Sequence, residues 1–201
     1  GIATLLFDRT DSNMNPMDMK FMDEIAAAIE RLATDDTIKG AIFTSGKPVF
    51  AAGADLKEME ASLDKADDLP VAERLKMNAS LSKLLRRMET CGKPVACAIN
   101  GTALGGGTEI ALACHYRVVS DARGIQLGLP EVQVGLLPGG GGTQRVSRLV
   151  GIQAAMPVVM EGQALSAEKA LKMGLVHKIV PADRLLAEAR RWLIEEGDAV
   201  Q

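Results

Sequence analysis

The chain has 201 residues, a net charge of −3 and a sequence pI near 5.5, so it lacks the general basic field of a nucleic-acid-binding protein. Its 47% apolar and 3% aromatic residues predict one folded domain with an aliphatic core and exclude a disordered chain. The three cysteines, Cys91, Cys97 and Cys114, lack a CxxC spacing, which argues against a disulfide framework or zinc site. No apolar run is long enough to span a membrane. We therefore expect a reduced, cytoplasmic protein with neither a nucleic-acid nor a membrane partner.

Strands and helices are expected to alternate along the chain. The expected strands cover residues 1–9, 38–48, 93–100, 116–121, 124–130 and 175–180. The expected helices cover residues 17–34, 72–90, 106–115, 151–160, 166–173 and 182–196, and a glycine loop at 139–142 leads into one more. The polar segment 60–72 is expected to form a mobile loop. This order predicts an α/β protein with a largely parallel sheet.

Two segments repeat one local pattern. "SGKPVFAAGAD" at 45–55 and "CGKPVACAING" at 91–101 both run from Gly-Lys-Pro-Val through small residues into a turn. Strand-and-turn units stacked in this way bring their turns to one edge of the structure. We expect the chemistry of the protein at that edge.

The glycine-rich loops do not match the nucleotide-binding patterns. Neither Gly105–Gly107 nor Gly139–Gly142 completes GxGxxG, and GxxxxGK[ST] is absent. No serine lies in GxSxG, HExxH is missing, and the adjacent Cys114 and His115 point in different directions on a helix. His177, on a predicted strand, is expected to be structural. The sequence therefore disfavours a nucleotide site, a nucleophilic hydrolase and a metal site.

Backbone N–H chemistry remains, because a glycine-rich helix start offers unpaired N–H groups to a ligand. "AAGAD" at 51–55 and "LGGGTE" at 104–109 each follow a strand, and such donors can form an oxyanion hole. Two carboxylates stand near these loops: Glu109, in the first turn of an apolar helix, and Glu131, among small and apolar residues. By pattern alone, Glu109 can equally complement the helix dipole and Glu131 can equally be a solvent-facing loop acid.

Three motifs resemble the crotonase, or enoyl-CoA hydratase/isomerase, family. They are "FAAGADLKEM", "NGTALGGGTEIALAC" and "LGLPEVQVGLLPGGGGTQRVSRLVG", and the resemblance runs from Ala3 to at least Val180. It implies a crotonase-like α/β fold of repeated ββα units, with mostly parallel sheets flanked by helices and a truncated C-terminal helical segment.

The resemblance also implies roles for individual residues. The oxyanion hole falls on the backbone N–H groups of Ala54 and Gly106, which would hold the thioester carbonyl of an acyl-CoA. The two family glutamates fall on Glu109 and Glu131, and Gly139 matches the glycine whose backbone helps to place the catalytic water. The residues expected to lie along the CoA are Ala52, Asp55, Leu56 and Lys57.

The implied reaction is hydration of a trans-2-enoyl-CoA in fatty-acid β-oxidation. One carboxylate helps to deprotonate the attacking water while the other delivers a proton to the α-carbon. We expect Glu131 to donate that proton and Glu109 to orient or activate water. Coenzyme A is part of the substrate, so no separate cofactor is implied. The alternative is a Δ3-Δ2-enoyl-CoA isomerase, for which one base suffices.

One departure from the family pattern bears on domain organisation. His115, in "ALACHYRVV", stands where many single-function members carry aspartate, and this segment resembles the hydratase half of multifunctional fatty-acid oxidation proteins. We expect residues 1–181 to form the hydratase domain and residues 182–201 to form a C-terminal helix leading to a missing downstream region. The expected partners are further copies of the chain, or a dehydrogenase domain fused to it in the parent protein. The alternative from another class is a truncated acyl-CoA-binding or scaffold domain with little activity.

Overall fold

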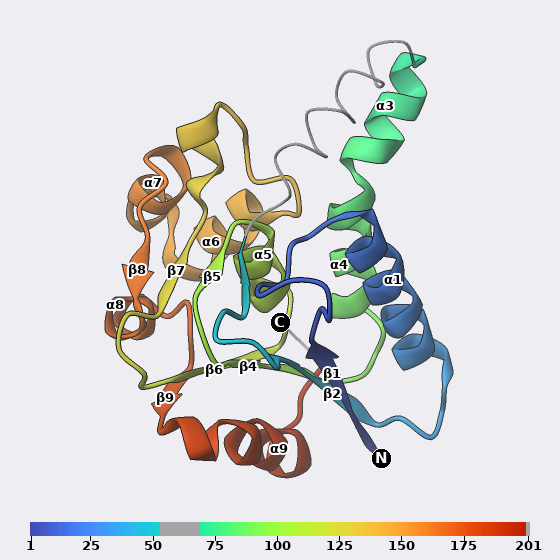
Figure 1. Ribbon diagram of the computed structural model, residues 1–201, viewed down its shortest axis with the longest axis vertical. Coiled ribbons are helices and arrows are strands. Elements are labelled where there is room, and N and C mark those ends of the chain that lie inside the picture. Colours follow the sequence, from blue (N-terminus) through green and yellow to red (C-terminus); the bar gives the residue numbers. More distant parts are fainter. Residues whose placement is uncertain (53–68, 200–201) are drawn as a thin grey trace.

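Strands and helices alternate through the described part of the chain, residues 1–52 and 69–199 of a computed structural model (Figure 1). The strands are β1 (Ile2–Phe7), β2 (Gly40–Ser45), β3 (Ala51–Ala52), β4 (Val95–Ile99), β5 (Ala103–Leu104), β6 (Tyr116–Ser120), β7 (Gln126–Gly128), β8 (Leu165–Ser166) and β9 (Lys178–Val180). The α-helices are α1 (Met19–Thr34), α3 (Val71–Asn78), α4 (Ser80–Glu89), α5 (Gly106–Leu112), α6 (Gly142–Val150), α7 (Ile152–Met160), α8 (Ala167–Met173) and α9 (Leu185–Glu195). Two 3₁₀ helices are η1 (Pro130–Val134) and η2 (Ala182–Arg184).

The strands form two sheets. The larger has the order β1-β2-β4-β6-β9, and all of its neighbours pair in parallel. The smaller has the order β3-β5-β7-β8, and only β8 runs antiparallel. Along the chain, a strand of the smaller sheet directly follows a strand of the larger one three times: β3 follows β2, β5 follows β4, and β7 follows β6. The predicted crotonase-like arrangement of repeated units and mostly parallel sheets is therefore confirmed.

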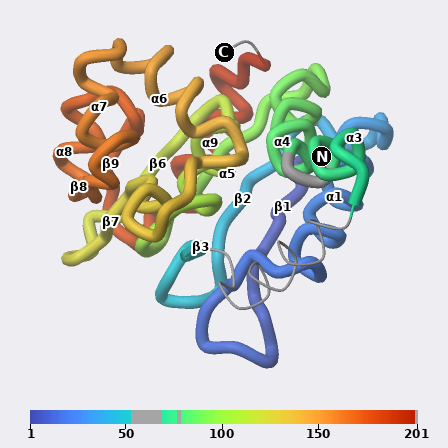
Figure 2. The backbone as a smooth tube through the Cα atoms, turned by 90° about the horizontal axis from the view of Figure 1, so that it is seen from above, coloured from blue at the N-terminus to red at the C-terminus, as the bar shows by residue number. Residues whose placement is uncertain are grey.

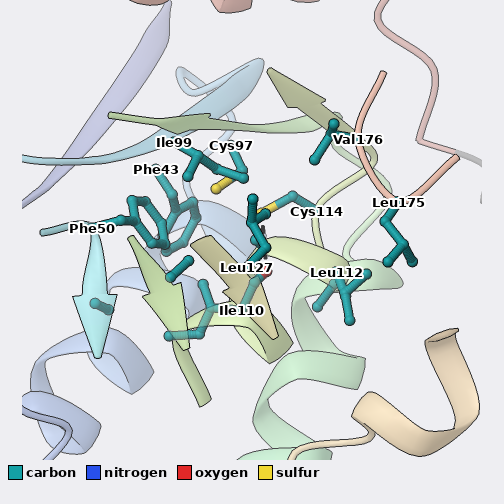
Figure 3. Close-up of a cluster of buried hydrophobic side chains, with 14 of the residues drawn as sticks. Phe43, Phe50, Cys97, Ile99, Ile110, Leu112, Cys114, Leu127, Leu175 and Val176 are labelled. Atoms are coloured by element: carbon teal, nitrogen blue, oxygen red, sulfur yellow. Dashed lines mark hydrogen bonds between the residues drawn. The ribbon is translucent and has the colours of Figure 1, made fainter. Parts of the chain in front are cut away.

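Both faces of the larger sheet are covered, which explains why its strands read as unbroken apolar runs. Along β4, Val95, Cys97 and Ile99 point into the core shared with α1, α4 and α5. Ala96 and Ala98 point to the opposite face, where α9 packs. In Figure 1, α5 lies above β4 and β6 while α9 lies beneath them. Figure 3 shows side chains from the two sheets and α5 meeting in the core that β4 shares with α1, α4 and α5.

The chain's four phenylalanines gather in one place. The ring of Phe7 lies 5.0 Å from Phe21, 5.8 Å from Phe43 and 5.5 Å from Phe50, measured between centroids. Tilted and edge-on pairs of this kind are favourable arrangements of aromatic rings. The cluster attaches the start of α1 to β1, β2 and the residue before β3.

Seen from above in Figure 2, α1, α3 and α4 lie at one end of the molecule and α7 and α8 at the other.

The smaller sheet brings three chain segments to one edge. Ala52, the last residue of β3, pairs in register with Leu104, the last residue of β5. Leu104 in turn pairs with Gly128, the last residue of β7. The ends of these three strands therefore lie side by side, at the kind of shared edge that the repeated sequence pattern predicted. This edge positions the candidate site.

The helix expected at 72–90 is two helices. α3 and α4 are separated at Ala79, whose ψ of 1° is not helical. The backbone hydrogen bonds from Ala79 N to Leu75 O and from Lys83 N to Ala79 O persist at 3.1 and 3.0 Å, so the interruption is one residue long. Asparagine and serine, which flank Ala79, are weak helix formers. Most of the expected loop at 60–72 lies outside the described residues, and residues 71 and 72 begin α3.

The start of α1 depends on Asp18, which the sequence-based boundary at residue 17 overlooked. Its side chain accepts a hydrogen bond of 2.8 Å from Phe21 N and also pairs with Arg9. We expect Asp18→Ala to lower the free energy of unfolding by about 1–2 kcal/mol, because a helix N-cap is lost. Urea denaturation measures this loss. The matched control is Asp23→Ala on the exposed side of the same helix, and an equal loss there would contradict the capping explanation.

Candidate active site

The three glycines before Glu109 fit α5 closely against the smaller sheet. Gly105 has φ 57° and ψ −129°, a conformation that side chains with a Cβ rarely adopt. A Cβ on Gly107 would lie 2.2 Å from the carbonyl oxygen of Ala51 in β3. Glycine at these positions therefore lets the start of α5 approach the strand ends directly.

Gly106 lies between two apolar side chains. A Cβ at this position would lie 2.5 Å from Met17 Sδ and 3.8 Å from Leu81 Cδ2. Leu81 Cδ2 would also lie 2.9 Å from a Cβ on Gly140. Met17 comes from the segment before α1 and Leu81 from α4, so two elements distant in sequence line the space around Gly106. Neither residue was predicted from the sequence to belong to the site.

Glu109 is a buried carboxylate held by backbone N–H groups. Glu109 is only 1% exposed to solvent, and its Oε1 accepts a hydrogen bond of 2.8 Å from Gly142 N. A Cβ on Gly140 would lie 2.6 Å from Glu109 Oε2, so the glycine segment before α6 lies directly against the carboxylate. Burial raises the pKa of Glu109, while hydrogen bonds from Gly142, Gly140 and Gly141 oppose that rise.

Glu131 lies in the first turn of η1, at the edge where β7 ends. The residue is half-buried, and its Oε2 is buried with no hydrogen-bond partner among the described residues. Burial raises the pKa of Glu131 to about 7, and the nearby charge of Glu109 adds to the rise. A buried and unpaired carboxyl oxygen is costly for folding alone. The environment is therefore one that favours a protonated carboxyl group near neutral pH.

The predicted site residues divide into three groups. Gly106, Glu109 and Glu131 lie at the same edge of the smaller sheet, and Ala52 ends the neighbouring strand β3. Gly139 is exposed, and a Cβ there would meet no atom within 4 Å. The remaining predicted residues, Ala54, Asp55, Leu56 and Lys57, lie outside the described part of the chain.

Two charged residues beside the site were not predicted. Arg145, in α6, donates a hydrogen bond of 2.6 Å to Gly140 O and forms an ion pair with Glu89 at the end of α4. Both residues are 9% exposed. The signal in the sequence was an arginine four residues after Gly141, which is one helical turn and returns its side chain to the loop. Its partner Glu89 is 56 residues away in sequence, so spacing could not reveal it.

The two histidines have structural partners. His115 Nδ1 accepts from Val95 N at 3.1 Å, which leaves Nε2 to donate to Glu89 O at 3.2 Å. His177 Nδ1 accepts from Arg117 N at 3.0 Å, and its ring stacks on Tyr116. Burial lowers the pKa of both imidazoles, that of His177 to about 4. Both rings are therefore neutral at pH 7, and the structural role expected for His177 is confirmed.

The profile of the enoyl-CoA hydratase/isomerase family matches residues 1–197. The chain therefore belongs to this family of enzymes, as the three motifs predicted.

The most informative relatives are one curated protein and two solved structures. The chain is 43% identical over 187 residues to the fatty acid oxidation complex subunit alpha of Idiomarina loihiensis, a match that covers 92% of this chain and 26% of the relative. The structure of Pseudomonas aeruginosa DspI is 32% identical with a TM-score of 0.80, covering 96% of this chain and 75% of that one. An enoyl-CoA hydratase from Bacillus anthracis is 29% identical with a TM-score of 0.80, covering 96% and 72%.

The first of these relatives is much longer than the chain. The chain spans about a quarter of its length, since the match covers 26% of the relative. This partial match confirms the predicted resemblance to one part of a multifunctional fatty-acid oxidation protein. Within the described residues, no helix combines the length and the apolar character needed to cross a membrane.

Proposed function

We propose that this chain is the enoyl-CoA hydratase unit of a fatty-acid oxidation protein and adds water to trans-2-enoyl-CoA. The observation that carries this proposal is the pairing of the two carboxyl groups. Glu109 is buried and bonded to Gly142 N, while Glu131 Oε2 is buried without a partner. The charge of Glu109 contributes to the raised pKa of Glu131, so the two carboxyl groups interact electrostatically. This is the arrangement that divides acid and base roles between two similar groups.

The thioester oxygen would be held by backbone donors. We assign this role to the N–H groups of Gly106 and Ala54, which follow the ends of β5 and β3. The parallel pairing of Ala52 with Leu104 supports the assignment, because it starts both segments at the same place. Each such donor contributes about 2.7–4 kcal/mol to stabilising the oxyanion. Asp55, Leu56 and Lys57 would continue along the CoA.

The two carboxyl groups would serve the two new bonds of one addition, the O–C bond at the β-carbon and the H–C bond at the α-carbon. Ionised Glu109 accepts a proton from water while the water oxygen bonds to the β-carbon, and Gly139 helps to orient that water. Protonated Glu131 gives its proton to the α-carbon, which yields 3-hydroxyacyl-CoA. Glu109 then holds the proton taken from water and Glu131 is ionised, so the release of one proton to solvent by Glu109 and the uptake of one by Glu131 restore both groups. Coenzyme A enters as part of the substrate, so the addition requires no separate cofactor.

This division of roles predicts the pH dependence of hydration. The pKa of Glu131 is raised to about 7, so the protonated acid disappears as the pH rises through that value. We expect kcat/KM to fall about tenfold per pH unit above the pKa, and to fall again at low pH where Glu109 becomes protonated. Stopped-flow measurement of the loss of enoyl absorbance across pH 5–9 would record the profile. A rate that increases through pH 7 would instead make Glu131 the base.

The same assay separates hydration from isomerisation. Two substrates, each followed by mass spectrometry of the product, separate the reactions: trans-2-enoyl-CoA reports hydration directly, because only hydration adds the mass of water, whereas 3-enoyl-CoA must first undergo the double-bond shift. We expect hydration of trans-2-enoyl-CoA to predominate, since both carboxyl groups are present. Isomerised product without hydration would favour the isomerase alternative. Tight acyl-CoA binding with no turnover would favour the acyl-CoA-binding or scaffold domain.

A further inference from the structure

A buried ion pair joins α4 to the glycine segment before α6. Arg145 Nε and Nη2 donate to the two carboxylate oxygens of Glu89 at 2.6 and 3.0 Å, and Arg145 Nη1 donates to Gly140 O at 2.6 Å. A planar guanidinium that donates three hydrogen bonds to two partners has a defined orientation, which lysine cannot reproduce. The ion pair therefore fixes the position of the arginine side chain close to Glu109.

The segment that Arg145 holds is the segment that contacts Glu109. Gly142 N donates to Glu109 Oε1 at 2.8 Å, and a Cβ on Gly140 would lie 2.6 Å from Glu109 Oε2. A Cβ on Gly141 would lie 2.3 Å from Arg145 Nη1, so the guanidinium lies directly against the same turn. Movement of the guanidinium would therefore displace the donors that orient the Glu109 carboxylate.

Glu89 is fixed from its own side as well. Its backbone carbonyl accepts from His115 Nε2 at 3.2 Å. Burial alone would raise the pKa of Glu89, but the hydrogen bonds and charge of Arg145, together with Arg86, hold it below its usual value. Glu89 is thus an ionised and buried partner that limits where Arg145 can lie.

We propose that Arg145 and Glu89 are a positioning pair that holds the 139–142 segment against Glu109 and so sets the direction of its carboxylate. The catalytic meaning of this pair rests on the hydration proposed above, whereas its effect on Glu109 can be measured without turnover. Among the described residues, the charged groups that face Glu109 are Glu131 from η1 and Arg145 from α6, with Glu89 from α4 behind Arg145.

The first test follows the titration of Glu109 itself. In protein carrying ¹³C-labelled glutamate, the Glu109 carboxyl signal is assigned by its loss in Glu109→Gln and followed against pH by NMR. We expect Glu89→Gln to lower the midpoint, because the Arg145 cation loses its counter-charge. We expect Arg145→Met to raise the midpoint, because the cation is lost. If Arg145→Met does not fold, the Glu109 midpoint in the isosteric variant Glu89→Gln decides the test alone.

The matched control is Arg117→Met. Arg117 is also a buried arginine, 2% exposed, but it donates to Leu175 O and Cys114 O. Its loss is expected to lower stability without moving the Glu109 midpoint. Midpoints that stay at the wild-type value in both folded pair variants, or that move in the same direction, would overturn the proposal.

The second test is kinetic. We expect Glu89→Gln and the charge-conserving Arg145→Lys to lower kcat on the order of 10²-fold with a much smaller change in KM, because a displaced carboxylate affects the reacting geometry more than binding. Unchanged kcat in folded Arg145→Lys would also overturn the proposal. If the two variants show the predicted titration shifts but the wild-type chain does not hydrate enoyl-CoA, the proposed function is rejected and the positioning pair stands.

Discussion

Replacing Glu131 by glutamine is expected to lower kcat for enoyl-CoA hydration by about 10²- to 10⁴-fold, because the amide cannot deliver a proton to the α-carbon. The side chain keeps its size, and Glu131 Oε2 has no hydrogen-bond partner to lose among the described residues. Binding of acyl-CoA should therefore change little. Loss of enoyl absorbance under saturating substrate measures the effect.

The control for this variant is Glu24→Gln, an exposed glutamate on α1. A second control is stability. The folded pKa of Glu131 is raised from 4.5 to about 7, so its ionisation costs stability, and that cost grows as the pH rises through this window. Glu131→Gln should consequently unfold at the same or a higher temperature than wild type at pH 8. Wild-type kcat in the folded variant would remove Glu131 from the mechanism.

Replacing Gly140 by alanine is expected to lower kcat by on the order of 10²-fold, because the new methyl group would displace the Glu109 carboxylate. The added Cβ would lie 2.6 Å from Glu109 Oε2, whereas ordinary contacts begin at 3.4 Å. Gly140 does not have a positive φ, so the backbone itself accepts alanine. The loss thus measures the position of Glu109 and not strain in the turn.

Gly139→Ala is the matched control, one residue away in the same segment. A Cβ there would meet no atom within 4 Å, and alanine keeps the backbone N–H proposed to orient water. We expect kcat within about threefold of wild type, as for most surface substitutions. Equal losses in the two variants would mean that the segment as a whole, and not the contact with Glu109, determines activity.

Much of the fold was predictable because its determinants are local. The apolar run at 93–100 was enough to predict the strand β4, and the helical spacing of Ile25, Ile29 and Leu32 indicated the buried side of α1. The alternation of these elements was enough to predict a mostly parallel α/β fold. The interruption at Ala79 was not predicted, because it is a single residue within a pattern that continues on both sides.

Glu109 and Glu131 were recognisable in sequence because each is a charge placed among small and apolar residues next to a glycine loop. Their chemical environments were not recognisable. The pKa of Glu131 in η1 depends on how far its oxygen is removed from water and on the charge of Glu109, which lies on a different element, α5.

The sequence by itself determined the order of the α-helices and the longer strands, the two glycine turns and the identity of the two carboxylates, since backbone propensity and side-chain type act over a few residues. The two-residue strands β3, β5 and β8 of the smaller sheet were not predicted, because so short a strand depends on its pairing partners. Only the tertiary structure decided that Ala52, Leu104 and Gly128 end side by side. It alone placed Glu89 against Arg145 across 56 residues of sequence. Contacts of this kind arise from sheet register and helix packing, which depend on the whole core and not on any one segment.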